Sequence, residues 1–158
     1  MTVYLQENKI YTLSNKPFPG LSKITQLNLY DNRISRIEGL LDLINLKKLY
    51  LEKNLIYKLE GLENCRSIEI VNLNHQLISS QMTFTFDEYS LAAISGSLKE
   101  LHLQSCRIKE PKPLYYLENI SYLDLKDNLI SDFDEQVCPL LQTMGRLEHL
   151  WLIGNPVT

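Results

Sequence analysis

Apolar residues recur along the chain in the pattern L-x-L-x-x-N-x-I. Three segments match it at every position: 27–34, 49–56 and 123–130. Four other segments match it more weakly: 3–10, 71–78, 101–108 and 150–157. The L-x-L alternation predicts a short strand whose apolar side chains enter a core while the residues between them face outward. The pattern therefore predicts seven short strands, each followed by a turn.

The sixth position of the pattern is occupied by a small or polar residue in every copy. These residues are Asn8, Asn32, Asn54, Gln76, Cys106, Asn128 and Asn155. They follow one another at intervals of 24, 22, 22, 30, 22 and 27 residues, so the basic period is 22 with three insertions. This form is typical of leucine-rich repeats. We therefore expect an α/β leucine-rich-repeat solenoid of about seven repeats, with a curved parallel sheet on its concave face and short 3₁₀ or α segments on its convex face.

The sixth position should have a structural role. Each strand is followed by a sharp turn, which leaves backbone N–H and C=O groups inside the coil. An asparagine side chain offers both donors and an acceptor, so it can bond to these groups and to the neighbouring coil. We expect all seven residues to form such a structural ladder. Cys106 fits the same small space with a weak S–H donor, whereas the extra methylene of Gln76 predicts a distorted coil.

The insertion 79–98 predicts a longer helix on the convex face. It contains Asp87 as a candidate N-cap, followed by apolar residues at helical spacing. These residues are Leu91, Ile94 and Leu98. We expect the longest convex helix here, within 87–98, and we expect Phe84 and Phe86 to anchor the loop that precedes it.

A second helix is predicted over 134–144. Its inward residues would be Leu140, Leu141 and Met144. Pro139 lacks a backbone N–H, so this helix either begins near Cys138 or kinks there. Elsewhere a repeat of 22 residues leaves too few residues for a full α-helix, so short 3₁₀ turns are expected on the convex face.

The chain of 158 residues has the size of one domain, 1–158, and 44% of its residues are apolar. Repeat solenoids need capping elements that cover the ends of their core. Here Met1 falls inside a repeat, and Thr158 follows directly on the last copy. We therefore expect either a fragment of a longer chain that lacks both end caps or a chain whose ends dock on neighbouring molecules.

Charge and cysteine content exclude several classes of function. Lys and Arg number 16 against 19 Asp and Glu, a formal charge of −3, whereas a protein that binds nucleic acid through phosphates normally has a basic excess. No stretch approaches 18 consecutive apolar residues, so a membrane partner is not expected. Cys65, Cys106 and Cys138 lack the C-x-x-C spacing of a zinc site and indicate reduced thiols in the cytoplasm. No cofactor or metal is expected.

The strand residues that face outward form the candidate binding surface. Seven of them are the candidate partner contacts: Tyr30, Tyr50, Glu52, Asn72, His102, Asp124 and Trp151. Tyrosine and tryptophan are frequent interface residues because they combine a large apolar surface with one polar group. Acidic residues outnumber lysines six to three on this surface, which favours a protein partner with basic patches.

Catalysis is not expected at this surface. His102 and Asp124 occupy equivalent positions on adjacent strands, with Ser105 nearby in sequence, but an open sheet face provides neither a pocket nor an oxyanion hole. His75, His102 and His149 lie in different rows of the sheet, which disfavours a metal site. The sequence therefore predicts a protein-binding module that is not an enzyme.

Several segments resemble the leucine-rich-repeat regulatory subunits of protein phosphatase 1, in particular the testis-type subunit associated with centrosomes and cilia. They are 60–65 (EGLENC), Gln76 with the insertion 77–98, 113–117 (PLYYL) and 154–157 (GNPV). The resemblance implies binding to the catalytic subunit of the phosphatase. It also implies a cytoplasmic location at the cytoskeleton, in a cilium, axoneme, basal body or centrosome.

The chain contains no linear docking peptide of the form Lys/Arg-Val/Ile-x-Phe/Trp, so the concave face would have to bind the phosphatase. The alternative is a structural scaffold of the axoneme or basal body. In that case the same face binds an axonemal or tubulin-associated protein, and no phosphatase takes part.

Overall fold

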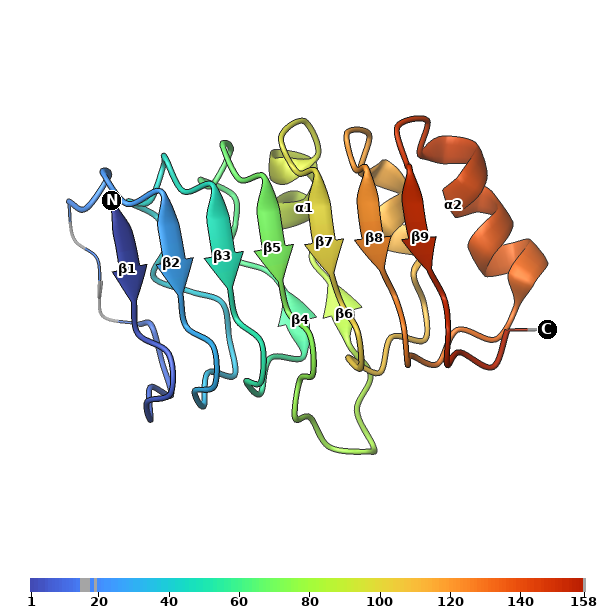
Figure 1. The fold of residues 1–158 in the computed structure, drawn as a ribbon, viewed down its shortest axis with the longest axis horizontal. Helices are drawn as coiled ribbons and strands as arrows, with labels where there is room; N and C mark the ends of the chain where they lie inside the picture. Colours follow the sequence, from blue (N-terminus) through green and yellow to red (C-terminus); the bar gives the residue numbers. More distant parts are fainter. Residues whose placement is uncertain (15–17, 19, 158) are drawn as a thin grey trace.

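A computed structural model describes residues 1–14, 18 and 20–157. Seven short strands within it form one parallel sheet, in which each strand pairs with that of the next repeat (Figure 1). In order they are β1 (Thr2–Tyr4), β2 (Gln26–Asn28), β3 (Lys48–Tyr50), β5 (Ile70–Asn72), β7 (Glu100–His102), β8 (Tyr122–Asp124) and β9 (His149–Trp151). The connecting segments return behind the sheet. The predicted solenoid is confirmed.

The alternation within each repeat keeps the strands in register. The central residue of each strand pairs with that of the next, as Leu27 does with Leu49 and Leu101 with Leu123. These four leucines are fully buried. Burial of a leucine side chain stabilises the fold by about 1.5–3 kcal/mol relative to leaving it in water. The apolar positions of successive repeats form one continuous core between the sheet and the convex segments.

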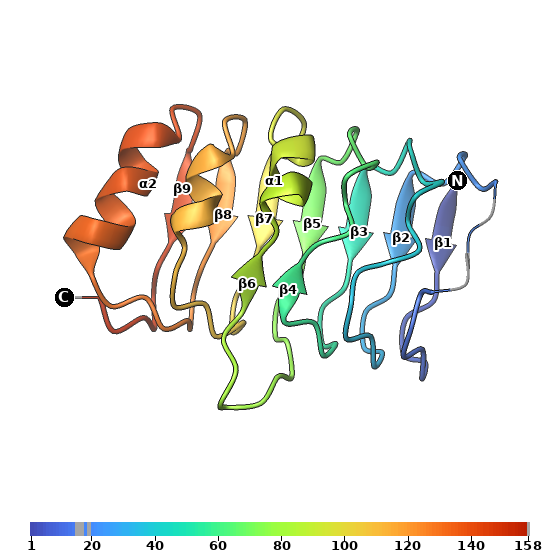
Figure 2. The same ribbon diagram turned by 180° about the vertical axis from the view of Figure 1, so that it is seen from behind.

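The convex face carries short elements, which lie behind the sheet in Figure 2. They are α1 (Glu88–Ile94), the 3₁₀ helix η1 (Lys112–Tyr116), the π-helical η2 (Phe133–Val137) and α2 (Cys138–Thr143). A small second sheet pairs β4 (Lys58–Leu59) with β6 (Thr85–Phe86) in parallel. The absence of long helices among the described elements is what a basic period of 22 residues allows.

The insertion 79–98 forms the predicted helix. α1 begins after Asp87, whose Oδ2 accepts a hydrogen bond from the backbone N–H of Ser90 at 3.0 Å, as an N-cap does. Phe84 is buried, and its ring meets that of Phe86 edge-on with 5.5 Å between the centroids. The two rings anchor the segment that leads into α1.

The second convex helix differs from the prediction in two respects. Five π-helical and six α-helical residues form one helical run over 133–143, which is longer than the seven residues of α1. Its α-helical part begins at Cys138, because the proline that follows is tolerated in a first turn. This start directs Leu140 and Met144 into the core but leaves Leu141 53% exposed, so the expectation for Leu141 was wrong.

The predicted ladder runs through the inner coils. The side chain of Asn54 is fully buried, and its Nδ2 donates to three backbone carbonyls of its own and the preceding coil at 3.0–3.2 Å. Its Oδ1 accepts from the backbone N–H of Ile34 at 2.9 Å. The arrangement recurs at Asn32, Asn128 and Asn155. Asn8 is exposed at the first coil, and its Nδ2 donates to carbonyls of that coil alone.

Gln76 takes its place in the ladder with hydrogen bonds of ordinary length, contrary to the predicted distortion. Its Nε2 donates to the carbonyls of Leu51 at 2.8 Å and Leu73 at 3.0 Å, and its Oε1 accepts from the N–H of Ile56 at 2.8 Å. The longer side chain therefore reaches two of the three equivalent carbonyls and the equivalent N–H. Cys106 is the weaker member, because its buried thiol donates to the Leu73 carbonyl at 3.0 Å but offers only a weak donor.

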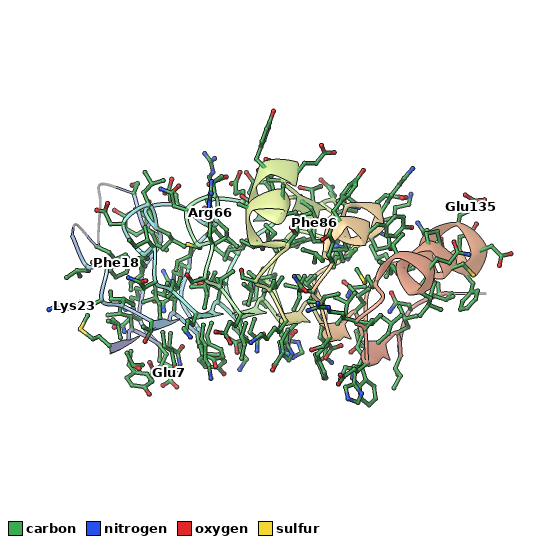
Figure 3. All side chains as sticks on the ribbon, turned by 90° about the horizontal axis from the view of Figure 1, so that it is seen from above. Glu7, Phe18, Lys23, Arg66, Phe86 and Glu135 are labelled. Carbon is green, nitrogen blue, oxygen red and sulfur yellow. The ribbon has the colours of Figure 1, made fainter. Side chains whose placement is uncertain are left out.

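A residue in the left-handed conformation precedes each ladder residue. Six of these are Glu7, Asp31, Lys53, His75, Ser105 and Asp127, with φ between 52° and 59°; the seventh is Gly154, with φ 80°. This conformation costs a non-glycine residue about 1–2 kcal/mol. The coil geometry therefore overrides local preference at six positions. The turn also places the side chain of this left-handed residue on the outer side of the sheet, where Figure 3 shows Glu7.

The two outermost coils are less buried than the inner ones. Val3, Leu5, Leu150 and Leu152 occupy core positions of the repeat but are only partly buried. Their counterparts in the five inner strands are fully buried. Within the described residues, β1 and β9 are therefore the least tightly packed strands of the sheet.

Candidate protein-binding surface

The outward residues of the strands cover one side of the sheet, which we call the concave face. In β2, β3, β5 and β7 the first and third residues are more exposed than the second, which is buried. Figure 3 shows side chains projecting from the sheet on the side opposite the helices. Five predicted contacts are half-buried on this face: Tyr30, Tyr50, Glu52, Asn72 and His102. Trp151 is 39% exposed.

The remaining predicted contact, Asp124, is only 3% exposed, so the expectation that it lies free on the surface was wrong. Its Oδ1 accepts a hydrogen bond from the backbone N–H of Lys126 at 3.0 Å, and its Oδ2 lies 3.1 Å from the Lys126 Nζ. The same Nζ lies over the ring of Trp151, 5.0 Å from a centroid of that side chain. Asp124 therefore holds Lys126 in place over the Trp151 ring, and its own charge is paired with that lysine.

Asn72 also bonds to the backbone beside it. Its Oδ1 accepts from the N–H of Asn74 at 3.1 Å, just as the Oδ1 of Asn28 accepts from the N–H of Tyr30 at 3.0 Å. Short polar side chains commonly bond in this way to an N–H two residues later. Asn72 remains half-buried, so part of its side chain stays accessible to a partner.

Glu52 lies in a different environment. Its Oε2 is buried and has no hydrogen-bond partner in the part of the chain that the structure describes. Burial raises the pKa of the Glu52 carboxyl above its ordinary value. The neighbouring Lys53 does not compensate, because its Nζ donates to the Tyr30 hydroxyl at 2.7 Å and lies 5.1 Å from the centroid of that ring. The pKa of Tyr50 is raised by burial and further by the charges of Glu52 and Glu100.

An aromatic group on β7, β8 and β9 was missed by the sequence analysis. The ring of Tyr122 lies 4.9 Å from that of His102 and 5.9 Å from that of His149, measured between centroids. Tyr122 and His149 are the first residues of their strands. The same alternation with a period of two, extended one residue ahead of the first leucine, would have identified them. The concave face therefore has a further row of outward residues.

The structure does not assemble a catalytic triad from His102, Asp124 and Ser105. His102 and Asp124 are register neighbours, but the His102 Nε2 lies 3.4 Å from an oxygen of Glu100. Asp124 is engaged by Lys126. Among the described residues, no group of three His, Cys, Asp or Glu side chains is arranged to hold a metal ion.

Two open surface pockets lie away from the concave face. One of about 300 Å³ lies on the convex side, where Arg36 and Glu60 form an ion pair of 3.0 Å. Another of about 430 Å³ lies beside the loops that precede the strands, where Glu69 bridges Lys47 and Lys99 at 3.1 and 3.0 Å. The charges in both are largely paired within the protein. In the described ranges, no helix is both long and apolar enough to cross a membrane.

The parallel sheet, the 22-residue period and the buried ladder define the leucine-rich-repeat fold. A family model described as leucine rich repeat matches residues 1–56. Solenoids of this class are typically non-catalytic and present an extended sheet face to other proteins. This fold is typical of protein-interaction modules.

Comparison with known proteins gives distant relatives of the same architecture. The chain is similar to nephrocan from Mus musculus, with 28% identity over 141 residues that cover 85% of this chain and 25% of nephrocan. Among solved structures, an internalin (inlF) from Listeria monocytogenes aligns with a TM-score of 0.64 and 22% identity over 99% of this chain and 48% of that one. Internalin C2 (inlC2) from the same species aligns with a TM-score of 0.68 and 26% identity. That alignment covers 96% of this chain and 70% of internalin C2. The chain spans about a quarter of nephrocan and about half of the first internalin.

Proposed function

We propose that the concave face binds a protein partner. The observation that carries this proposal is the set of aromatic side chains on an otherwise polar sheet face. Tyr4 is 64% and Trp151 39% exposed, and Tyr30 and Tyr50 are half-buried between them. Such side chains are frequent anchors at protein interfaces. Seven strands spaced by about 4.8 Å give a surface roughly 30 Å long.

The specific partner that we propose is the catalytic subunit of protein phosphatase 1. The solenoid would target or regulate the enzyme in the cytoplasm, at a cilium, axoneme, basal body or centrosome. This proposal is supported by the sequence resemblance at 60–65, at Gln76 with 77–98, at 113–117 and at 154–157. Since no linear docking peptide is present, the phosphatase would occupy the concave face.

The alternative is a scaffold function, in which the concave face binds an axonemal or tubulin-associated protein and no phosphatase. The 22-residue period is compatible with this alternative, because many axonemal proteins share it, but the period is not specific and does not separate the two candidates. The two candidates share the binding surface and differ in what occupies it, so the identity of the captured partner separates them.

The first prediction tests the surface. Tyr50→Ala combined with Trp151→Ala should abolish partner capture, because loss of one buried aromatic anchor typically costs about 2 kcal/mol or more of binding free energy. The matched control combines Tyr89→Ala with Tyr116→Ala, two tyrosines that are 81% and 65% exposed on convex elements. The measurement is co-precipitation from an extract of ciliated cells, probed for phosphatase 1 and for tubulin-associated proteins.

Each outcome of that experiment decides between the candidates. Phosphatase recovered by the wild type and the control, but lost in the concave variant, supports the phosphatase proposal. Axonemal proteins recovered without phosphatase, and lost in the same variant, support the scaffold. Equal recovery by all three proteins removes the concave face from both candidates. Circular dichroism should be the same for all three, since the four tyrosine and tryptophan side chains lie outside the core.

A further inference from the structure

The polar side chains on either side of Glu52 form hydrogen bonds with other residues and not with Glu52. Tyr30 and Asn74 hold the equivalent positions in the two neighbouring coils. The Tyr30 hydroxyl is 2.7 Å from the Nζ of Lys53, and the Oδ1 of Asn74 accepts from the backbone N–H of Gln104 at 2.7 Å. Because both side chains are bonded elsewhere, the Oε2 atom of Glu52 has no hydrogen-bond partner among the described residues.

Glu52 also lacks a counterion. No lysine or arginine of the described segments lies within ion-pair distance of its carboxylate; Lys53 is bonded to Tyr30, and Lys126 is paired with Asp124. The carboxylate is nevertheless half-buried next to Tyr50, whose pKa is raised in part by the charge of Glu52. An unpaired charge that is partly removed from water is unfavourable in the free protein.

We propose that the Glu52 carboxylate, next to the rings of Tyr30 and Tyr50, receives an arginine side chain of the protein partner. This inference rests on the proposed binding function of the concave face and adds the chemistry of the partner. A guanidinium donates to a carboxylate oxygen and stacks on an aromatic ring at the same time, which a lysine ammonium does less well. The acid and the neighbouring ring of Tyr50 match both properties of arginine, whereas the Tyr30 ring is already in contact with Lys53.

The accessibility of the site fits such a contact. The Oε2 atom is covered, but the side chain as a whole is half-buried, so a guanidinium can approach the carboxylate from the concave side. Attraction between opposite charges is stronger there than in bulk water, because the effective dielectric constant is lower. Part of the desolvation of the carboxylate has already occurred on folding, so the remaining desolvation cost of binding is smaller.

The test uses an octa-arginine peptide as the probe and compares three proteins by NMR titration at one low salt concentration. They are the wild type, Glu52→Gln and the control Glu118→Gln, which removes the same charge from an exposed position behind the sheet. We expect the Kd of octa-arginine to rise about tenfold in E52Q and less than twofold in E118Q. Amide resonances of Tyr50 and Glu52 should shift on binding. Octa-lysine should bind the wild type more weakly than octa-arginine, and E52Q should lose most of that difference.

Two results would overturn the inference: equal Kd values for the wild type and E52Q, or resonance shifts confined to other faces. Equal binding of octa-arginine and octa-lysine would overturn the arginine assignment. E52Q should also reduce capture of the cellular partner. If the Tyr50 and Trp151 double variant loses that partner while E52Q keeps it, this inference fails and the proposed function stands. If the double variant keeps the partner, the proposed function itself fails.

Discussion

Two parts of the concave face contain the same three kinds of residue and use them differently. Each has an acid, a lysine and an aromatic residue: Glu52, Lys53 and Tyr30 in the N-terminal part, and Asp124, Lys126 and Trp151 in the C-terminal part. In the C-terminal part the lysine binds the acid and covers the aromatic side chain. In the N-terminal part the lysine binds the tyrosine, and the Oε2 atom of the acid has no hydrogen-bond partner among the described residues. The acid of the C-terminal group is thus paired with a lysine in the free protein, whereas the acid of the N-terminal group has no counterion among the described residues.

The position of each lysine within its repeat explains the difference. Lys126 comes two residues after Asp124, so both side chains lie on the same side of the extended backbone. Lys53 comes directly after Glu52, in the left-handed turn with φ 52°, and its side chain crosses to the preceding coil. Composition alone therefore does not decide whether an acid on this face is structural or available to a partner. The position of the neighbouring lysine relative to the turn decides this.

The second prediction has the largest expected effect on stability and concerns the ladder beneath both groups. Asn54→Ala should lower the free energy of unfolding by about 1–3 kcal/mol, because the buried N–H of Ile34 loses its acceptor and three backbone carbonyls each lose one donor. Asn8→Ala is the matched control and should change it by less than about 0.5 kcal/mol, since Asn8 is exposed. Urea unfolding measures both. Equal effects of the two substitutions would contradict the ladder.

The third prediction separates the two acids. Asp124→Ala should destabilise the fold by about 1–2 kcal/mol, because it removes the acceptor for the Lys126 N–H and leaves that lysine without its counterion. Asp124→Asn keeps the Oδ1 acceptor and should cost less. If Asp124→Ala unfolds at the same urea concentration as the wild type, Asp124 is not structural and the distinction between the two groups fails.

The fourth prediction concerns Glu52 and is the smallest. Because burial raises its pKa in the folded state, Glu52 contributes stability that is fully present below the ordinary pKa of glutamate and is lost as the pH rises through the raised value. Glu52→Gln removes this loss. The variant should match the wild type at pH 4 and be slightly more stable at pH 7, by less than about 1 kcal/mol, since the side chain is partly exposed. A variant less stable than the wild type at pH 7 would show that the carboxylate is favourably paired.

The strands, the ladder and the N-cap of α1 could be predicted because they depend on spacing. A period of 22 places each asparagine against the backbone of the preceding coil, and L-x-L marks the buried side of each strand. Even Gln76 follows this rule, because its longer side chain still bonds to the preceding coil and to its own coil. The exposure of Leu141 was missed because the helical phase depends on the start at Cys138.

The candidate surface could be predicted only in part. The alternation shows which residues face outward, but not which of them fold back on neighbours, so the burial of Asp124 was not foreseen. The direction of Lys53 depends on Tyr30, which lies 23 residues earlier and is brought near by the coil. That contact leaves Glu52 unpaired. The distinguishing property of the site is therefore set between repeats and is absent from any single copy of the pattern.

The central claim is that the concave face is the surface a partner covers, and hydroxyl-radical footprinting of the complex tests it most directly. The complex is that of the wild-type chain with the protein it captures, compared with the free chain. We predict that oxidation of Tyr4, Tyr50 and Trp151 falls on binding, while oxidation of the exposed convex residues Tyr89 and Tyr116 stays unchanged. Protection of Tyr89 and Tyr116, with Tyr4, Tyr50 and Trp151 as reactive as in the free chain, would contradict the account.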